Sequence, residues 1–389
     1  MKNIKCLFLT TEFPPGPGGI GIHSFYIIKE MKSQYNWDFN IVLTQLDNAS
    51  AKEMDLFKEK YLFPIFLLKK SPNIFRLIIN IFVLFIHALK YNPNVIISSG
   101  KHATWFAAIL KFFLRKKLIS FGHGSEFGTK IAKELKINKL SYSFSDLIIS
   151  VSHYTLNFIN NQTDVKVKKH VVVSNGADDH QFFKIDSNSV NIFKKKNGLT
   201  NRRIITTVGN VSERKGQWVT IKAMPHILKS FPNTYYYCIG NDSQKKKYMT
   251  LAKKLNVYDN IVFTGKKSIE ELNIWLNCSD IFIMTSTHTS KGDFEGFGIA
   301  VIEAALCGVP AIVSKGNNGV IESIEEDKTG FGVEEKNYKE VAEKVNFLLT
   351  NDKLRELMGE NARKRAIKSY TWKIKVKEIY KKINNLYLK

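Results

Sequence analysis

Cysteine is scarce in this sequence. The four cysteines of the 389 residues lie far apart inside apolar segments and include no Cys-x-x-Cys pair; they are Cys6, Cys238, Cys278 and Cys307. That spacing indicates neither a disulfide framework nor a zinc site. We therefore predict four buried thiols in a reducing cytoplasm.

Long apolar runs are also missing. The longest extends from residue 77 to residue 89, which is shorter than the roughly 20 residues that cross a bilayer. The apolar run at residues 4–9 is too short for a signal peptide and is typical of a buried first strand. The sequence therefore predicts a cytoplasmic protein without a transmembrane span.

Acidic residues are few relative to basic ones. Lys and Arg number 58 against 35 Asp and Glu, a net charge of +23, which favours an anionic partner through long-range attraction. The basic residues are scattered, and no helix-turn-helix, zinc-finger or RNP-type motif accompanies them. Nucleic acid is therefore not the expected partner.

An anionic membrane surface fits the charge better. Residues 61–91 place Lys69, Lys70, Arg76 and Lys90 around the aromatic and aliphatic run, an arrangement that can rest on anionic lipid at the inner face of the plasma membrane. Two interpretations stay open: peripheral contact with such a membrane, and an ordinary core helix in a lysine-rich chain. The run by itself slightly favours the core helix.

Short apolar runs separated by amphipathic stretches are abundant. Such runs, bounded by Gly, Ser and Asn, are typical of parallel sheets built from β-α-β units. The predicted strands lie at 4–9, 39–43, 95–98, 117–121, 147–151 and 171–173, and then at 204–209, 235–240, 261–264, 281–284 and 311–314. A polar, lysine-rich passage at 186–203 separates the two sets. We predict an α/β protein of two Rossmann-like parallel-sheet domains, 1–185 and 186–367, with ligands bound in a cleft that the two domains face.

The segment from Gly292 to Pro310 carries the clearest chemistry. Gly296 and Gly298 let the backbone approach a ligand, and the apolar stretch 299–306 reads as a helix whose first free N–H groups favour a phosphate. Glu295 and Glu303 lie on either side of that helix start, and carboxylates accept hydrogen bonds from hydroxyls. A ligand with a diphosphate between two polyhydroxylated rings is a nucleotide sugar. The spacing alone is equally consistent with an ordinary amphipathic helix that has one exposed acid.

Two further segments place polar groups at predicted strand ends. The loop after strand 204–209 carries the adjacent cations Arg214 and Lys215, which suit phosphate oxygens. His123 follows strand 117–121 and stands between two glycines, so we expect it to be exposed at the carboxyl edge of its sheet. A solvated loop and a structural histidine are the respective alternatives.

These segments occur in the order found in the retaining glycosyltransferases of family 4, which the sequence resembles from Glu12 to Phe331. The matching motifs are the paired glutamates, Cys307-Gly308-Val309-Pro310, Gly319 with Glu322, and Thr329-Gly330-Phe331. The resemblance implies the GT-B fold, with a C-terminal helix at 368–389 that packs back on the first domain.

The resemblance also implies roles for individual residues. In this family the His123 position contacts the donor sugar, the Lys215 position grips the diphosphate, and Glu295 orients the sugar hydroxyls; these three are the predicted catalytic residues. One departure is that Asn210 stands where the family has Arg, and Arg214 is the candidate to replace it. The remaining predicted donor-binding residues are Gly18, Gly19, Gly240, Gly265, Gly296, Phe297, Gly298, Ile299 and Glu303.

The implied activity is transfer of a hexose from a nucleotide-diphosphate sugar to a glycan or lipid-linked acceptor, with retention of configuration and without a metal ion or other cofactor. The phrase Asp293-Phe294-Glu295-Gly296-Phe297-Gly298 resembles the mannosyltransferase branch, which hints at GDP-mannose. A capsule, O-antigen or lipopolysaccharide precursor is the expected setting. The alternatives are a nucleotide-sugar epimerase of the same fold and a non-catalytic basic protein that binds lipid or nucleic acid.

Overall fold

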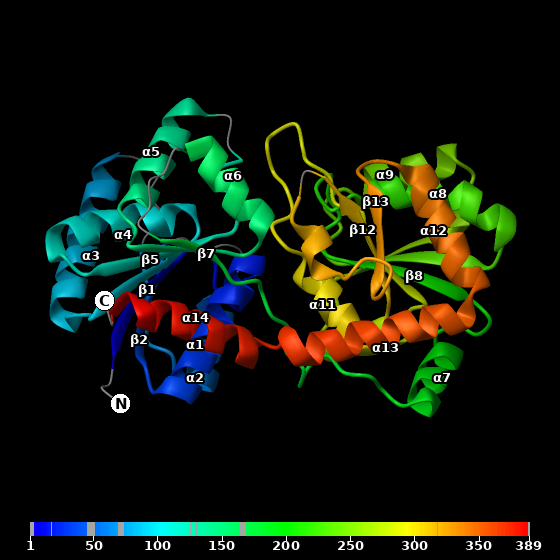
Figure 1. Ribbon diagram of the computed structural model, residues 1–389, viewed down its shortest axis with the longest axis horizontal. Helices are drawn as coiled ribbons and strands as arrows, with labels where there is room; N and C mark the ends of the chain where they lie inside the picture. The colour runs from blue at the N-terminus through cyan, green and yellow to red at the C-terminus, as the bar shows by residue number, and fades with distance from the viewer. Residues whose placement is uncertain are drawn as a thin grey trace. The chain divides into compact units, whose positions relative to one another are not determined.

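The protein folds as two compact units, each an α/β domain (Figure 1). The computed structural model describes residues 4–16, 18–44, 51–68, 74–124, 126–128, 131–163, 169–316 and 318–387. Unit 1 consists of Met1–Asn175 and Trp372–Lys389, and unit 2 of Gly176–Thr371.

Unit 1 is built on a sheet of seven parallel strands in the order β3-β2-β1-β4-β5-β6-β7. The strands are β1 (Lys5–Thr10), β2 (Asp38–Leu43), β3 (Ile65–Leu67), β4 (Val95–Ser99), β5 (Lys117–Gly122), β6 (Leu147–Ser150) and β7 (His170–Val172). Its helices are α1 (Gly19–Tyr35), α2 (Ala51–Tyr61), α3 (Ile74–Tyr91), α4 (Lys101–Leu114), α5 (Ala132–Ser143), α6 (His153–Thr163) and α14 (Trp372–Tyr387). Strand residues such as Leu7, Ile96 and Leu118 are fully buried, as expected for a parallel sheet covered by helices on its faces.

The C-terminal helix α14 belongs to unit 1 and packs beside α1 (Figure 1). Its apolar stripe is buried, with Trp372, Val376, Ile379 and Ile383 each at most 3% exposed. Trp372 stacks on the ring of Tyr26 at a centroid distance of 5.3 Å. The stripe of one residue every three or four positions therefore serves as the covering face of this helix.

Unit 2 repeats the architecture with six parallel strands in the order β10-β9-β8-β11-β12-β13. The strands are β8 (Arg203–Val208), β9 (Thr234–Ile239), β10 (Ile261–Gly265), β11 (Ile281–Met284), β12 (Ala311–Lys315) and β13 (Gly330–Glu334). The helices are α7 (Ser187–Lys196), α8 (Gln217–Ser230), α9 (Lys245–Lys254), α10 (Ile269–Asn277), α11 (Ile299–Leu306), α12 (Tyr338–Thr350) and α13 (Asp352–Ser369), with short 3₁₀ turns η1 (Tyr258–Asn260) and η2 (Val320–Ser323).

The chain passes between the units earlier than the sequence pattern indicated. Residues 176–185, assigned above to the first domain, belong to unit 2 because their backbone is held by α10: Asn273 accepts from the Phe183 N–H at 3.2 Å and Asn277 from the Ile185 N–H at 2.8 Å. Ala177 also forms a parallel bridge with Thr371. Residues 368–371 likewise stay in unit 2, so the C-terminal crossing follows Thr371.

Three local predictions change in the structure. The polar passage at 186–203 contains helix α7, whose first turn is capped by the Asp186 side chain accepting from the Ser189 N–H at 2.9 Å. The strands β3 and β13 lie in segments where no strand was predicted. The run at 77–89 lies in α3, which is buried along one side only, so the core-helix interpretation is wrong for its other side. Lys69 and Lys70 lie outside the described residues.

The four cysteines are buried free thiols, as predicted. None of the described helices is both long enough and apolar enough to cross a membrane.

Replacing Ile379 with alanine tests the covering role of α14. The side chain of Ile379 is only 1% exposed. Truncating a buried isoleucine lowers the free energy of unfolding by about 2–5 kcal/mol because a cavity remains. We expect Ile379→Ala to lower the urea midpoint clearly, whereas Lys381→Ala, at an exposed position of the same helix, should leave it nearly unchanged. Equal midpoints for the two variants would contradict the packing of α14.

Candidate functional site

The polar residues predicted in the second domain gather at the carboxyl ends of β8, β9 and β10 and beside the extension of β11. Ligands of parallel α/β sheets bind beyond these strand ends, where loops rather than helices meet the ligand. Gly209 follows β8, Gly240 follows β9 and Gly265 ends β10. The Gly240 N–H donates to the Gly265 carbonyl at 3.0 Å, so the three strand ends form a continuous backbone edge.

Close packing explains two of these glycines. A Cβ on Gly240 would lie 2.3 Å from the Gly209 carbonyl oxygen, and Gly240 has φ +150°. A Cβ on Gly209, which has φ +142°, would lie 3.0 Å from Cε of Lys215. These positions therefore need glycine so that the loop and the Lys215 side chain can lie against the backbone edge.

The loop from Asn210 to Gly216 is fixed by the threonines that extend β11. Thr287 donates from its N–H to the Arg214 carbonyl at 2.8 Å and from its hydroxyl to the Glu213 carbonyl at 2.7 Å. The Thr285 hydroxyl donates to the Gly216 carbonyl at 2.8 Å. The backbone of the two cationic residues is thus held on a buried strand extension.

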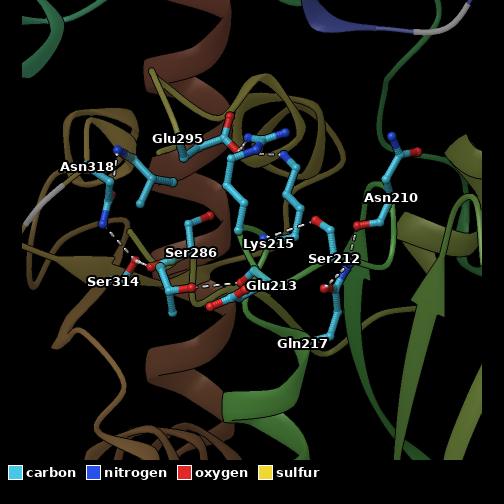
Figure 2. Close-up of polar contacts among 12 residues, drawn as sticks. Asn210, Ser212, Glu213, Lys215, Gln217, Ser286, Glu295, Ser314 and Asn318 are labelled. Atoms are coloured by element: carbon cyan, nitrogen blue, oxygen red, sulfur yellow. Dashed lines mark hydrogen bonds and ion pairs between the residues drawn. The ribbon is translucent and has the colours of Figure 1, made fainter. Parts of the chain in front are cut away.

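The same loop is closed internally by Gln217, the first residue of α8. Its amide nitrogen donates to the Asn210 carbonyl at 3.1 Å, and its amide oxygen accepts from the Ser212 N–H at 3.3 Å (Figure 2). The side chain of Asn210 itself is exposed. Asn210 therefore contributes its backbone to the loop and does not join the charged groups described next.

Arg214 and Lys215 converge on one carboxylate oxygen. Nη1 of Arg214 lies 2.5 Å and Nζ of Lys215 lies 2.8 Å from Oε2 of Glu295, and Figure 2 shows Lys215 and Glu295 pointing toward each other. The Glu295 and Lys215 side chains are only 12% and 13% exposed. We call these three residues the ion triad; it carries two positive charges and one negative charge.

The ion triad changes the acidity of its members. Burial by itself raises the pKa of Glu295, but the charges of Arg214 and Lys215 and their hydrogen bonds outweigh it and lower the pKa to about 2. Burial lowers the pKa of Lys215, with Arg214 acting in the same direction and Glu295 opposing them. Glu295 is therefore a carboxylate at neutral pH, held by both cations.

The main chain of Glu295 leads directly into helix α11. Its carbonyl accepts from the Gly319 N–H at 2.8 Å. Gly298 is the N-cap, with φ 93°, and a Cβ there would lie 2.8 Å from a methyl of Val320. The helix begins at Ile299, as predicted, and its first N–H groups need partners from outside the helix.

The aromatic residue of this segment faces inward. Phe297 is 2% exposed and its ring stacks on Tyr370 at 5.9 Å. A donor contact from Phe297 can therefore come only from its backbone, as can contacts from Gly296 and Gly298 beside it.

Glu303 lies in the second turn of α11, on a half-buried position. Burial raises its pKa to about 7, an effect that the charge of Lys215 offsets only in part. The two glutamates thus differ in state: Glu295 stays ionised, whereas Glu303 takes up a proton near neutral pH. A carboxyl group that is partly protonated can donate a hydrogen bond to a hydroxyl or accept one from it.

In unit 1, His123 follows β5 at the carboxyl edge of its sheet. The ring is half-buried rather than exposed, because it packs edge-on against His23 at 4.7 Å and its Nε2 is 2.9 Å from the Ser99 hydroxyl at the end of β4. The backbone N–H of His123 donates to Oε1 of Glu126 at 3.1 Å. Burial lowers the pKa of His123, with Glu126 opposing it, so the neutral imidazole prevails.

Gly18 and Gly19 open helix α1 of the same unit. Gly18 is its N-cap with φ 136°, and a Cβ there would lie 1.9 Å from Oε2 of Glu12. Gly19 has open space around its Cβ position. The loop therefore requires glycine at 18 for packing and leaves the backbone at 19 accessible.

Several supporting residues were not predicted. Thr285, Thr287 and Gln217 fix the cationic loop, and Ser99 holds the ring of His123. For Thr285, Thr287 and Ser99 the sequence signal is a hydroxyl residue at or just after a strand end, and that signal gains meaning once the strand order brings β8 beside β11 and β4 beside β5. Gln217, the first residue of α8, has no such signal. Within the described ranges no three or more His, Cys, Asp and Glu residues cluster as metal ligands do.

Comparisons with known proteins agree over almost the whole chain. Residues 17–181 match Glycosyltransferase Family 4 and residues 189–365 match Glycosyl transferases group 1. An uncharacterized glycosyltransferase of Methanocaldococcus jannaschii is 26% identical over 408 aligned positions, covering 98% of each chain. A GDP-mannose-dependent monoacylated alpha-(1-6)-phosphatidylinositol monomannoside mannosyltransferase of Corynebacterium glutamicum is 25% identical and 95% of each chain is covered.

The fold comparison points the same way. The crystal structure of HepE from Anabaena in complex with UDP-glucose has a TM-score of 0.81 to this chain at 19% identity, over 98% of this chain and 100% of that one. At this identity the likeness concerns the fold alone. Together, the two matched regions, the pair of parallel sheets and the ordered motifs show that the chain belongs to the family 4 glycosyltransferases and has the GT-B fold.

Proposed function

We propose that this glycosyltransferase moves a hexose, with mannose favoured, from a nucleotide-diphosphate sugar to a glycan or lipid-linked acceptor, with retention of configuration and without a metal ion. The observation that carries the proposal is the convergence of Arg214 and Lys215 on Glu295 at the start of α11.

The charge of the ion triad supports an anionic ligand. One carboxylate neutralises one of the two cations, so one positive charge remains, and the free N–H groups of α11 add the partial positive charge of a helix N-terminus. A diphosphate supplies the missing negative charge. Glu295 then keeps its own role, which is to accept hydrogen bonds from the hydroxyls of the transferred sugar.

These fixed groups can stabilise the leaving diphosphate. In the proposed step the bond from the sugar C1 to the diphosphate oxygen breaks, and the developing charge falls on oxygens near Lys215 and Arg214. A phosphate oxygen accepts the proton of the acceptor hydroxyl, which bonds to C1 on the same face. His123 stabilises the oxocarbenium-like state. Donors that are already oriented toward developing charge lower such barriers by about 3–4 kcal/mol each.

The donor is proposed to be GDP-mannose. The Glu295 segment resembles that of mannosyltransferases, and the Corynebacterium relative is named as GDP-mannose-dependent. The HepE structure, whose sequence is 19% identical to this chain, is of a complex with UDP-glucose. UDP-glucose is therefore the competing donor. We place the reaction at the cytoplasmic side of the membrane, in the synthesis of a capsule or lipopolysaccharide precursor.

A thermal-shift screen against GDP-, UDP- and ADP-sugars tests the donor. A ligand that binds only the folded protein stabilises it by about 2.7 kcal/mol at a hundredfold excess over Kd. We expect GDP-mannose to raise the Tm most, both with and without a metal chelator. No shift with any sugar nucleotide contradicts the proposal, and donor turnover to an epimer without an acceptor would identify an epimerase instead.

Substitutions in the cationic loop test the leaving-group role. We expect Lys215→Ala to lower kcat/KM by about 100- to 1,000-fold, as for loss of one preorganised donor, and Arg214→Ala by roughly 10- to 100-fold. If Arg214 replaces the arginine that family members have at 210, the double change Arg214→Ala with Asn210→Arg recovers part of the loss.

The control for these variants is Lys229→Ala, on an exposed position of α8 in the same unit. It should leave kcat/KM unchanged. A Lys215→Ala enzyme within a factor of about two of the unmodified one would remove the proposed role, because a factor of two is only about 0.4 kcal/mol.

The raised pKa of Glu303 predicts a pH-dependent gain in stability on substitution. A carboxyl group whose pKa is near 7 in the folded protein and lower in the unfolded one makes folding less favourable as pH rises through that window. Glu303→Gln removes this penalty, so we expect it to exceed the original protein in stability by about 1–3 kcal/mol at about pH 8 and to match it at about pH 4.

Urea unfolding across that pH range provides the measurement, with Glu356→Gln, at an exposed position of α13, as the matched control. The same Glu303→Gln protein should bind the sugar nucleotide more weakly. A stability difference that does not change with pH would show that Glu303 ionises normally.

A further inference from the structure

One stretch of the chain has no acidic residue. None of residues 60–125 is Asp or Glu, whereas ten are Lys or Arg: Lys60, Lys69, Lys70, Arg76, Lys90, Lys101, Lys111, Arg115, Lys116 and Lys117. The stretch includes helices α3 and α4 of unit 1. The stretch therefore contributes ten positive charges and no negative charge to the chain.

Helix α3 divides into a packed side and an open side. Asn80, Leu84 and Ala88 are buried, and the two apolar ones belong to the core that α4 also lines. The other side is apolar as well, yet it is exposed; it consists of Phe75, Ile78, Ile79, Phe82, Val83, Ile86 and Leu89. Phe75 is 71% and Phe82 is 63% exposed. A helix that covers only a core has polar residues on its outer side.

The open side continues onto the end of α4. Phe112 and Phe113 are 64% and 61% exposed, and the ring of Phe113 lies 5.8 Å from that of Phe85 on α3. We call these two phenylalanines and the seven exposed residues of α3 the α3 face. Monomeric proteins seldom expose contiguous apolar patches of this kind without an interaction to cover them.

Cations border the α3 face at both helices. Arg76 and Lys90 lie near the two ends of α3, and Arg115 and Lys117 lie two and four residues after Phe113; all four are exposed. Two acids from other elements pair with cations of the stretch: Asp146, just before β6, pairs with Lys111 and reaches Lys117 at 4.0 Å, and Glu134 of α5 pairs with Lys101 at 2.8 Å. An apolar centre with a cationic border is the pattern of a helix that lies in the interface of an anionic bilayer.

A second copy of the chain fits this border less well. Two α3 faces packed together would place their predominantly cationic borders side by side, and like charges brought together oppose association. A lipid surface that carries negative headgroups complements the border and accepts the aromatic side chains. We propose that the α3 face inserts into the interface of an anionic lipid bilayer.

This inference deepens the proposed function, because it names the surface on which a lipid-linked acceptor is met. Its test does not depend on catalysis. Flotation with phosphatidylcholine vesicles, with and without phosphatidylglycerol, measures binding of the full chain directly. We expect binding to the phosphatidylglycerol vesicles, weakened by salt, and little binding to phosphatidylcholine alone.

The double variant Ile78→Ser with Phe82→Ser should bind the anionic vesicles at least about tenfold more weakly, a loss that corresponds to about 1.4 kcal/mol. Leu357→Ser is the matched control, because Leu357 is also an exposed apolar residue, 52% exposed, on α13 of unit 2. Both proteins should keep a cooperative thermal unfolding transition like that of the original protein, which shows that they remain folded.

A label at position 82 reports insertion directly. The four natural cysteines are buried, so Phe82→Cys offers a selective site for an environment-sensitive fluorophore, and Leu357→Cys offers the control. A blue shift with anionic vesicles at position 82 alone supports the inference. Unchanged flotation of the double variant overturns it, as does a solution dimer that the double variant dissociates. A protein that binds vesicles through this face and ignores every sugar nucleotide would support the surface and refute the proposed function.

Discussion

The candidate site depends on one buried ionic arrangement, in which two cations share a single carboxylate oxygen. Arg214 and Lys215 come from the loop after β8, whereas Glu295 comes from the segment before α11. Breaking such an arrangement on one side leaves an uncompensated charge with little water around it, which is strongly unfavourable. The loop and the helix start are therefore fixed relative to each other before any ligand arrives.

The rest of unit 2 supports that arrangement through main-chain contacts. The threonines after β11 hold the carbonyls of the cationic loop, and glycines at the ends of β8 and β9 let the strand ends touch. The remaining free groups, which are one surplus positive charge and the N–H groups of α11, all favour an anion. The same geometry gives the two glutamates different pKa values. The cations lower the pKa of Glu295 to about 2, whereas burial raises the pKa of Glu303 to about 7. A site that binds both a diphosphate and sugar hydroxyls needs groups in both states.

Much of the fold followed from local pattern. Short apolar runs identified eleven of the strands, and Gly298 together with the alanine-rich stretch placed the start of α11 at Ile299. The sequence pattern failed where local composition and tertiary contact disagree. The strand β3 is short and only half-buried, and its apolar residues lie in the segment 61–91 that was interpreted as a lipid-facing or core helix region. The lysine-rich α7 has no buried residue at all, so it shows no apolar run that marks a core element. The unit boundary shifted because hydrogen bonds from α10 capture residues 176–185.

The sequence by itself determined the family, the two parallel-sheet domains, and the residue types that we propose to meet a nucleotide sugar, because motifs and periodicity are local properties of the chain. Only the tertiary structure decided which of those residues meet. It joined Arg214 to Glu295 across 81 positions, left Asn210 outside the ion triad, and partly buried His123 against His23. It also showed that one side of α3 stays uncovered. The reason is physical: contacts, burial and the pKa shifts that follow from them depend on strand order and packing, which bring together residues that no local pattern connects.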